Sequence, residues 1–153
     1  MKTYEETAEG DDMTWKDKQD KLEEIAEKHG SEFLICALGW ADILIDLNSD
    51  LGKVVPDYRA LQIKEKFGVL RCYIDQAELM DPEIRKQAYD AIGRAEIRSQ
   101  GACEICGKDA TQTETSWVKT FCPQHTEKMK TKGFSEIVKE FYQENNLEWN
   151  LGW

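Results

Sequence analysis

Two pairs of metal-ligand residues constrain this chain more than any other feature. The first pair is Cys103 and Cys106, the second is Cys122 and His125, and fifteen residues separate Cys106 from Cys122. This spacing is typical of a structural zinc site, in which four protein ligands surround the ion and leave no coordination position for water. The sequence therefore predicts a tetrahedral Cys3His site, with structural Zn²⁺ as the cofactor.

The residues around the ligands predict a small zinc finger. Gly107 permits a tight backbone turn directly after the second sulfur. Residues 111–115 and 117–121 are rich in threonine, valine and aromatic residues, which favours a short hairpin turning near Ser116. Pro123 is typical of a first helical turn, so a helix carries the last two ligands. Knuckle, hairpin and helix in this order predict a treble-clef-like finger, and a plain zinc ribbon is the alternative.

The rest of the chain predicts an α+β fold. Alternating apolar and polar residues indicate a hairpin that turns at residues 66–68. The apolar run at residues 33–38 is too short to assign to a helix or a strand. We expect helices packed on a small antiparallel β-hairpin or sheet, with the finger docked on it. Helical spacing of apolar residues predicts four helices outside the finger, at residues 14–30, 39–51, 81–101 and 134–142.

The predicted organisation is an acidic arm followed by one domain. Residues 1–12 are polar and acidic without apolar periodicity, so we expect a disordered or loosely attached acidic arm. Residues 13–153 are expected to form a single domain, with the finger at about residues 101–133. We expect no membrane span and no signal peptide. Five cysteines without a disulfide pattern favour a reducing cytoplasm, or the host cytoplasm if the protein is encoded by a phage.

The acidic residues are concentrated in the N-terminal third. Residues 1–51 hold 14 acidic residues and 5 lysines, a net charge of −9, out of −10 for the whole chain. Uniform acidity would argue against nucleic-acid binding, but the finger itself is not acidic. Asp42, Asp46 and Asp50 recur at intervals of four and form one stripe of a predicted helix. This stripe is a candidate contact with a partner or a solvated face.

Basic residues provide candidate contacts with nucleic acid. Phe67 and Tyr73 are interleaved with basic residues of the first hairpin, and such a surface can stack bases and contact phosphates; a charged outer sheet face is the alternative. The candidate contacts on the hairpin and on the finger helix are Lys64, Lys66, Arg71, Lys128, Lys130 and Lys132. The tail alternates apolar and polar residues and contains Trp149 and Trp153. It is either an edge strand or a terminal peptide with two tryptophan anchors for a partner.

Several ordered motifs resemble a family of uncharacterised zinc-finger proteins found in bacteriophages and bacteria. The resemblance covers roughly residues 39–125. It implies a phage or bacterial origin and no established activity. The motifs that carry it are Gly39-Trp40 with Leu44 and Leu47, residues 62–68 with Leu70-Arg71, Ala95-Glu96 with Ser99, Cys103-Glu104-x-Cys106-Gly107, and Trp117 with Thr120-Phe121-Cys122-x-x-His125.

Three classes of function are compatible with these features. A nuclease of the HNH type needs a histidine base and ligands for a catalytic metal, whereas this chain contains His29 and a second histidine, His125, already assigned to zinc. We therefore expect that the protein is not an enzyme. A nucleic-acid-binding treble-clef protein is the alternative. The favoured interpretation is a zinc-stabilised module that binds a host or cellular protein, in a phage setting as an inhibitor or modulator of a host protein or defence system.

Overall fold

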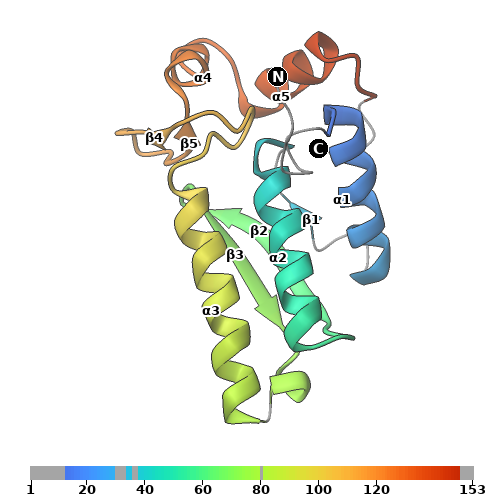
Figure 1. Ribbon diagram of the computed structural model, residues 1–153. Helices are drawn as coiled ribbons and strands as arrows, with labels where there is room; N and C mark the ends of the chain where they lie inside the picture. The colour runs from blue at the N-terminus through green and yellow to red at the C-terminus, as the bar shows by residue number, and fades with distance from the viewer. Residues whose placement is uncertain (1–12, 30–33, 36–37, 80, 149–153) are drawn as a thin grey trace, which may run out of the picture.

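The computed structural model describes residues 13–29, 34–35, 38–79 and 81–148 and has an α+β fold (Figure 1). The predicted arm at residues 1–12 and the tryptophans Trp149 and Trp153 lie outside the described residues. The α-helices are α1 (Trp15–His29), α2 (Ala41–Val54), α3 (Pro82–Ser99), α4 (Pro123–Lys128) and α5 (Phe134–Glu144). The strands are β1 (Leu34–Ile35), β2 (Ala60–Lys66), β3 (Val69–Ile74), β4 (Thr111–Gln112) and β5 (Thr120–Phe121). Short 3₁₀ helices span Leu38–Trp40 and Gln76–Leu79.

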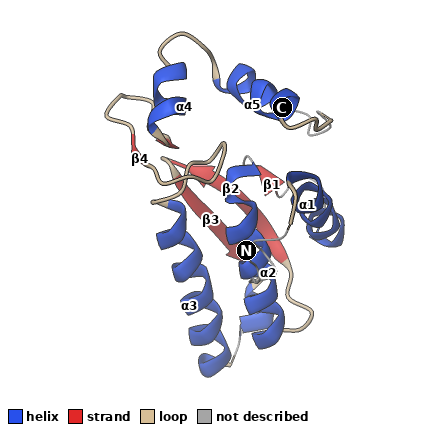
Figure 2. Cartoon of the chain, turned by 45° about the horizontal axis from the view of Figure 1, so that its top comes forward, coloured by secondary structure: helices blue, strands red, loops and turns tan. Residues whose placement is uncertain are grey.

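The main sheet has the strand order β1-β2-β3. Strands β2 and β3 form the predicted antiparallel hairpin, in which Lys64 lies opposite Arg71 and Gln62 lies opposite Tyr73. Helices α2 and α3 cross one face of this sheet, and α1 lies beside α2, as Figure 1 and Figure 2 show from two directions. Leu70 of β3 is fully buried, whereas Tyr73 is 45% exposed. The hairpin therefore has one core face and one more exposed face.

Side-chain caps fix the start of two predicted helices. The Thr14 hydroxyl accepts a hydrogen bond from the Asp17 amide at 3.0 Å, and the Asp17 carboxylate accepts one from the Thr14 amide at 3.2 Å. This reciprocal pair is a capping box. The Asp81 carboxylate accepts from the amides of Glu83 and Ile84 at the start of α3. The structure confirms both predicted helix starts.

The C-terminal helix packs against the N-terminal helix and the finger. The Trp15 ring of α1 meets the Phe141 ring of α5 edge-on, with 5.1 Å between ring centroids. The Gln19 side chain is buried and donates to the Glu148 carbonyl at 3.1 Å. Phe134, at the start of α5, stacks parallel to the Phe121 ring of β5. Residues from both ends of the described chain thus contribute to one core.

The metal-ligand knuckle lies directly against the start of α2. The Gly39 amide donates to the Glu104 carbonyl at 2.8 Å, and the indole nitrogen of Trp40 donates to the Ala102 carbonyl at 2.9 Å. The Trp40 side chain has no exposed surface. The backbone of the finger is therefore packed against the helical part of the chain.

Gly39→Ala should destabilise the protein by about 3 kcal/mol, the upper end of the usual cost of over-packing. A Cβ atom at this position would lie 2.2 Å from the Cys103 carbonyl oxygen and 2.4 Å from the Glu104 carbonyl oxygen. Neither backbone atom can rotate away. The control Gly52→Ala lies on α2 with nothing within 4 Å of the added Cβ, and it should stabilise by about 0.5–1 kcal/mol because alanine favours the helix. Urea denaturation measures both; equal stability of the two variants would contradict the tight contact.

Three features differ from the sequence-based expectations. The sheet includes a parallel pairing of β1 with β2 in addition to the predicted antiparallel hairpin. Strands β4 and β5 are two residues each, shorter than residues 111–115 and 117–121. Helix α4 ends at Lys128, so Lys130 and Lys132, which the sequence placed on the finger helix, lie in the turn after it. These differences concern lengths and long-range pairing, and the α+β class is confirmed.

Candidate metal centre

Three elements deliver the four predicted ligands to one place. Cys103 and Cys106 belong to the knuckle between α3 and β4, Cys122 directly follows β5, and His125 lies on α4. The knuckle turns tightly: the Gly107 amide donates to the Cys103 carbonyl at 2.8 Å. Gly107 has a φ of 82°, a left-handed conformation that glycine adopts without strain. The structure thus confirms the role predicted for this glycine.

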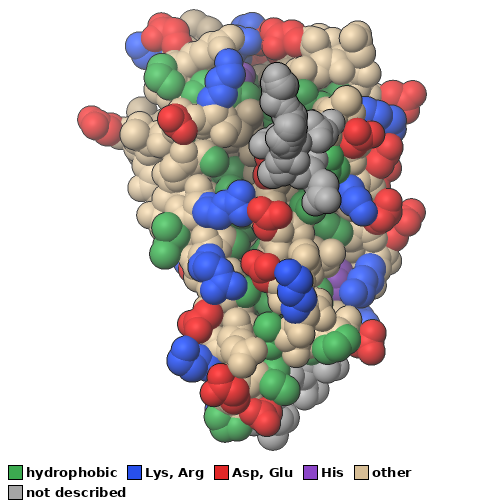
Figure 3. Space-filling model, viewed as in Figure 1, with side chains coloured by type: hydrophobic (Ala, Val, Ile, Leu, Met, Phe, Trp, Pro, Cys, Tyr) green, Lys and Arg blue, Asp and Glu red, His purple; other side chains and the backbone are tan. Residues whose placement is uncertain are grey.

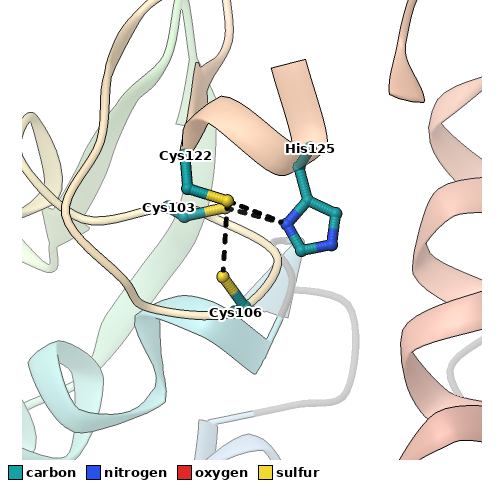
Figure 4. A group of neighbouring side chains, drawn as sticks. All are labelled: Cys103, Cys106, Cys122 and His125. Atoms are coloured by element: carbon teal, nitrogen blue, oxygen red, sulfur yellow. Dashed lines mark hydrogen bonds between the residues drawn. The ribbon is translucent and has the colours of Figure 1, made fainter. Parts of the chain in front are cut away.

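The ligand atoms of these residues all lie within 4.8 Å of one another. The Cys103 sulfur is 3.5 Å, and the Cys122 sulfur 3.3 Å, from His125 Nδ1. The Cys106 and Cys122 sulfurs are 3.7 Å apart. Figure 4 shows the three sulfurs and the ring nitrogen pointing toward a common centre. Three of the side chains are buried and Cys106 is partly exposed. This arrangement is that of a metal-binding site with four protein ligands.

Hydrogen bonds between the thiols shift their acidities in opposite directions. The hydrogen bond with Cys106, followed by burial, raises the pKa of the Cys103 thiol to about 12. The same hydrogen bond with Cys103 lowers the pKa of Cys106. Thiolates are the form that coordinates a metal, so a bound cation would replace these protons and the bonds they make.

A buried ion pair next to the ligands was not predicted from the sequence. The Lys119 ammonium lies 2.8 Å from the Glu104 carboxylate, and these side chains are 4% and 1% exposed. The Glu65 carboxylate of β2 is 3.3 Å from the same ammonium. Lys119 also lies 4.1 Å from the Phe134 ring centroid, within cation–π range. Because Glu104 lies between two metal ligands in the sequence, this lysine connects the knuckle to the β2-β3 hairpin and to α5.

The lysines of the finger helix and of the turn after it form ion pairs within the chain. Lys128 lies 3.0 Å from Glu140, and Lys132 contacts the same carboxylate. Lys130 pairs with Glu127 at 3.1 Å. Glutamates of α4 and α5 thus compensate much of the positive charge of these lysines, which were candidate contacts with nucleic acid.

The basic residues of the first hairpin lie together on its more exposed face. The register places Lys64 opposite Arg71, and Lys66 opposite Val69. Arg71 forms an ion pair with Glu96 at 3.6 Å, while neither lysine forms one with the part of the chain that the structure describes. Among the described residues, this cluster therefore retains charge without a partner, unlike the lysines of the finger helix and of the turn after it.

The acidic stripe on α2 is partnered by basic residues of neighbouring helices. Figure 3 shows basic and acidic side chains next to one another on this face of the molecule. The closest distances are 3.2 Å for Asp42 with Lys18, 2.8 Å for Asp46 with Arg98, and 3.7 Å for Asp50 with Arg94. The pairs are partly exposed, as expected for a solvated helix face, and a contact of the stripe with a partner stays a prediction.

The fold and the cluster together define an α+β protein with a Cys3His metal-binding centre built into its core. Comparisons with protein-family models, with curated proteins and with solved structures found no match. Within the described segments, no helix has the length and apolar character needed to cross a membrane.

Proposed function

We propose that the Cys3His cluster holds one structural zinc ion and that the protein is a zinc-stabilised protein-binding module. The donor set supports zinc, because thiolate and imidazole ligands in a tetrahedron suit this ion. The position of His125 on α4 supports a treble-clef-like finger rather than a ribbon. The observation that carries the proposal is the convergence of four protein ligands on one point.

The distances support an ion of this size. With Zn–S about 2.3 Å and Zn–N about 2.0 Å, a regular tetrahedron places two sulfurs about 3.8 Å apart, and a sulfur and a nitrogen about 3.5 Å apart. The corresponding distances in the protein are 3.7 Å for Cys106 and Cys122, and 3.5 and 3.3 Å for the two sulfurs nearest His125. Three of the six ligand–ligand distances thus match those that zinc requires, and all six are within 4.8 Å.

A site with four protein ligands favours a structural role over a catalytic one. Catalytic zinc retains an open position for water or substrate, and four protein ligands complete the tetrahedron. The neighbours of these ligands, Ala102 and Glu104, bond to the surrounding fold through Gly39, Trp40 and Lys119. The proposed role of zinc is therefore to hold a surface in shape, and recognition by that surface is the proposed function.

A protein is the proposed partner. The internal ion pairs of Lys128, Lys130 and Lys132 reduce the charge available for a phosphate backbone. We propose a host or cellular protein as the partner and, in a phage setting, inhibition or modulation of that protein as the role. Nucleic-acid binding, supported by the basic face of the β2-β3 hairpin, is the second candidate.

Affinity purification from a bacterial lysate separates the two candidates. The tagged protein is incubated with and without nuclease, at low and at high salt, beside a Cys103→Ser variant as the metal-deficient control. We expect a defined protein partner that survives nuclease and high salt and is absent from the control. Recovery of nucleic acid that is lost at high salt, without a protein partner, would contradict the protein-binding proposal.

A further inference from the structure

The turn of the β2-β3 hairpin presents an aromatic side chain in a strained conformation. Phe67 has a φ of 55° and Gly68 a φ of 77°, so both central residues of the turn have positive φ. Such turns favour Asn-Gly or Gly-Gly, and a bulky residue at positive φ is strained. Phe67 is 67% exposed, so burial of its ring does not offset the free-energy cost of this conformation. Strained residues of this kind persist only where the surrounding structure holds them, and they are most frequent at functional sites.

The finger holds this turn in place. The Thr120 hydroxyl of β5 donates to the Gly68 carbonyl at 2.5 Å, and the Gln112 amide of β4 donates to the Phe67 carbonyl at 3.4 Å. The Glu65 carboxylate accepts from the Gly68 amide at 2.7 Å and pairs with Lys119. Both small strands of the finger thus contact the turn that presents the aromatic ring.

Basic and aromatic residues continue from this turn along the exposed face of the hairpin. Lys64 and Arg71 lie opposite each other in the middle, and Tyr73, 45% exposed, lies opposite Gln62 at the far end. At about 3.3 Å per residue, the five steps from position 62 to position 67 span about 17 Å. We call this surface the hairpin strip; it consists of Lys64, Lys66, Phe67, Arg71 and Tyr73.

The charge of the hairpin strip selects an acidic partner. Lys64 and Lys66 have no ion pair with the described part of the chain, and Arg71 meets Glu96 at 3.6 Å with both side chains partly exposed. The strip is therefore a local basic surface on a chain of net charge −10. An acidic ligand gains attraction there in spite of the acidic net charge of the chain.

The dimensions of the strip favour a protein segment over a nucleic acid. Single-stranded nucleic acid is bound by a basic groove that follows many phosphates and by rings that stack successive bases. Here Phe67 and Tyr73 lie at opposite ends of the strip, and the basic residues lie between them, with Lys66 next to the Phe67 turn. Aromatic ends and a basic middle are complementary to an extended peptide with apolar ends and an acidic middle.

We propose that the hairpin strip binds an extended acidic segment of a partner protein, with apolar side chains of that segment on Phe67 and Tyr73 and its carboxylates on Lys64 and Lys66. This proposal rests on the proposed function, because it names the surface through which the zinc-stabilised module recognises its partner. The metal centre takes part indirectly, since the finger positions the Phe67 turn.

Fluorescence anisotropy of the purified, zinc-loaded protein tests the strip. The probe is a fluorescein-labelled peptide with consecutive glutamates flanked by leucines, and the comparison ligands are the same peptide with lysines in place of the glutamates and a single-stranded oligothymidine. We expect the protein to bind the acidic peptide and neither of the two comparison ligands. Phe67→Asn and Lys64→Glu should each weaken it about tenfold or more, as at interface hot spots. The control Lys53→Glu, on the exposed surface of α2, should leave it unchanged.

The Phe67→Asn variant separates binding from folding. Asparagine tolerates positive φ, so this variant should melt at or above the temperature of the wild type while it loses the peptide. If the folded, zinc-loaded wild type binds no acidic peptide, the proposed role of the hairpin strip is wrong, and the proposal of a zinc-stabilised module is unaffected. Tighter binding of oligothymidine than of the acidic peptide would also contradict the proposed role of the strip. So would a partner protein that the wild type and Phe67→Asn capture equally. A wild type that binds no zinc refutes the proposed function instead.

Discussion

Replacing Cys103 with serine should release the metal and unfold the finger. The free energy of zinc binding in small metal-folded units is about 10–16 kcal/mol, so loss of a ligand removes a large part of what folds this segment. The effect should extend beyond the finger, because Gly39 and Trp40 at the start of α2 hydrogen-bond to the knuckle backbone. We expect amide hydrogen exchange to lose protection first in residues 101–133 and then at the start of α2.

Cys72 provides the matched control for this variant. It is a buried cysteine of β3, outside the metal cluster, and burial raises the pKa of its thiol to about 12. Cys72→Ala should keep the metal and cost about 1 kcal/mol for the lost packing. Chelation of the wild type should reproduce the exchange pattern of Cys103→Ser. If Cys103→Ser and Cys72→Ala show the same stability and the same exchange, the metal does not fold the finger.

Lys119→Met should destabilise the protein by about 3–5 kcal/mol, the usual cost of removing one partner of a buried ion pair. The Glu104 carboxylate is 1% exposed and would remain buried without this ammonium group. The charge of Glu65, 3.3 Å from the same lysine, would lose its compensation too. Thermal and urea denaturation measure the loss, and elemental analysis shows whether zinc is retained.

Two further variants isolate the contribution of the buried pair. Lys119→Met combined with Glu104→Leu should recover part of the stability, because an apolar pair of similar volume often replaces a buried ion pair at little cost, while Glu65 stays without its lysine. Lys130→Met removes an exposed pair with Glu127, whose side chains are 65% and 74% exposed, and should change the stability by less than about 1 kcal/mol. A cost for Lys119→Met no larger than that for Lys130→Met would contradict this account.

The ligands of the metal centre could be predicted because the information is local. Cys103 and Cys106, like Cys122 and His125, are so close in sequence that a single turn brings each pair together. The starts of α1 and α3 were equally accessible, since Thr14 and Asp81 cap amides two or three residues away.

Features that depend on long-range packing could not be predicted. Strand β1 is two residues long and is defined by its parallel pairing with β2, almost thirty residues later, so its own sequence contains no periodicity to detect. Nothing in the sequence around Lys119 indicates that this lysine is buried. Its burial depends on the docking of the finger against Glu65 and Phe134. The ion pairs of Lys128 and Lys132 with Glu140 likewise require α5 to fold back against α4.

X-ray absorption spectroscopy at the zinc edge of the purified protein tests the central claim most directly. The claim is that three thiolates and His125 Nδ1 complete the coordination of one zinc ion, so that the metal shapes a recognition surface. The account predicts three sulfur ligands at about 2.3 Å, one nitrogen at about 2.0 Å and no oxygen ligand. Protein without zinc, or zinc with a solvent oxygen in its coordination sphere, would contradict it.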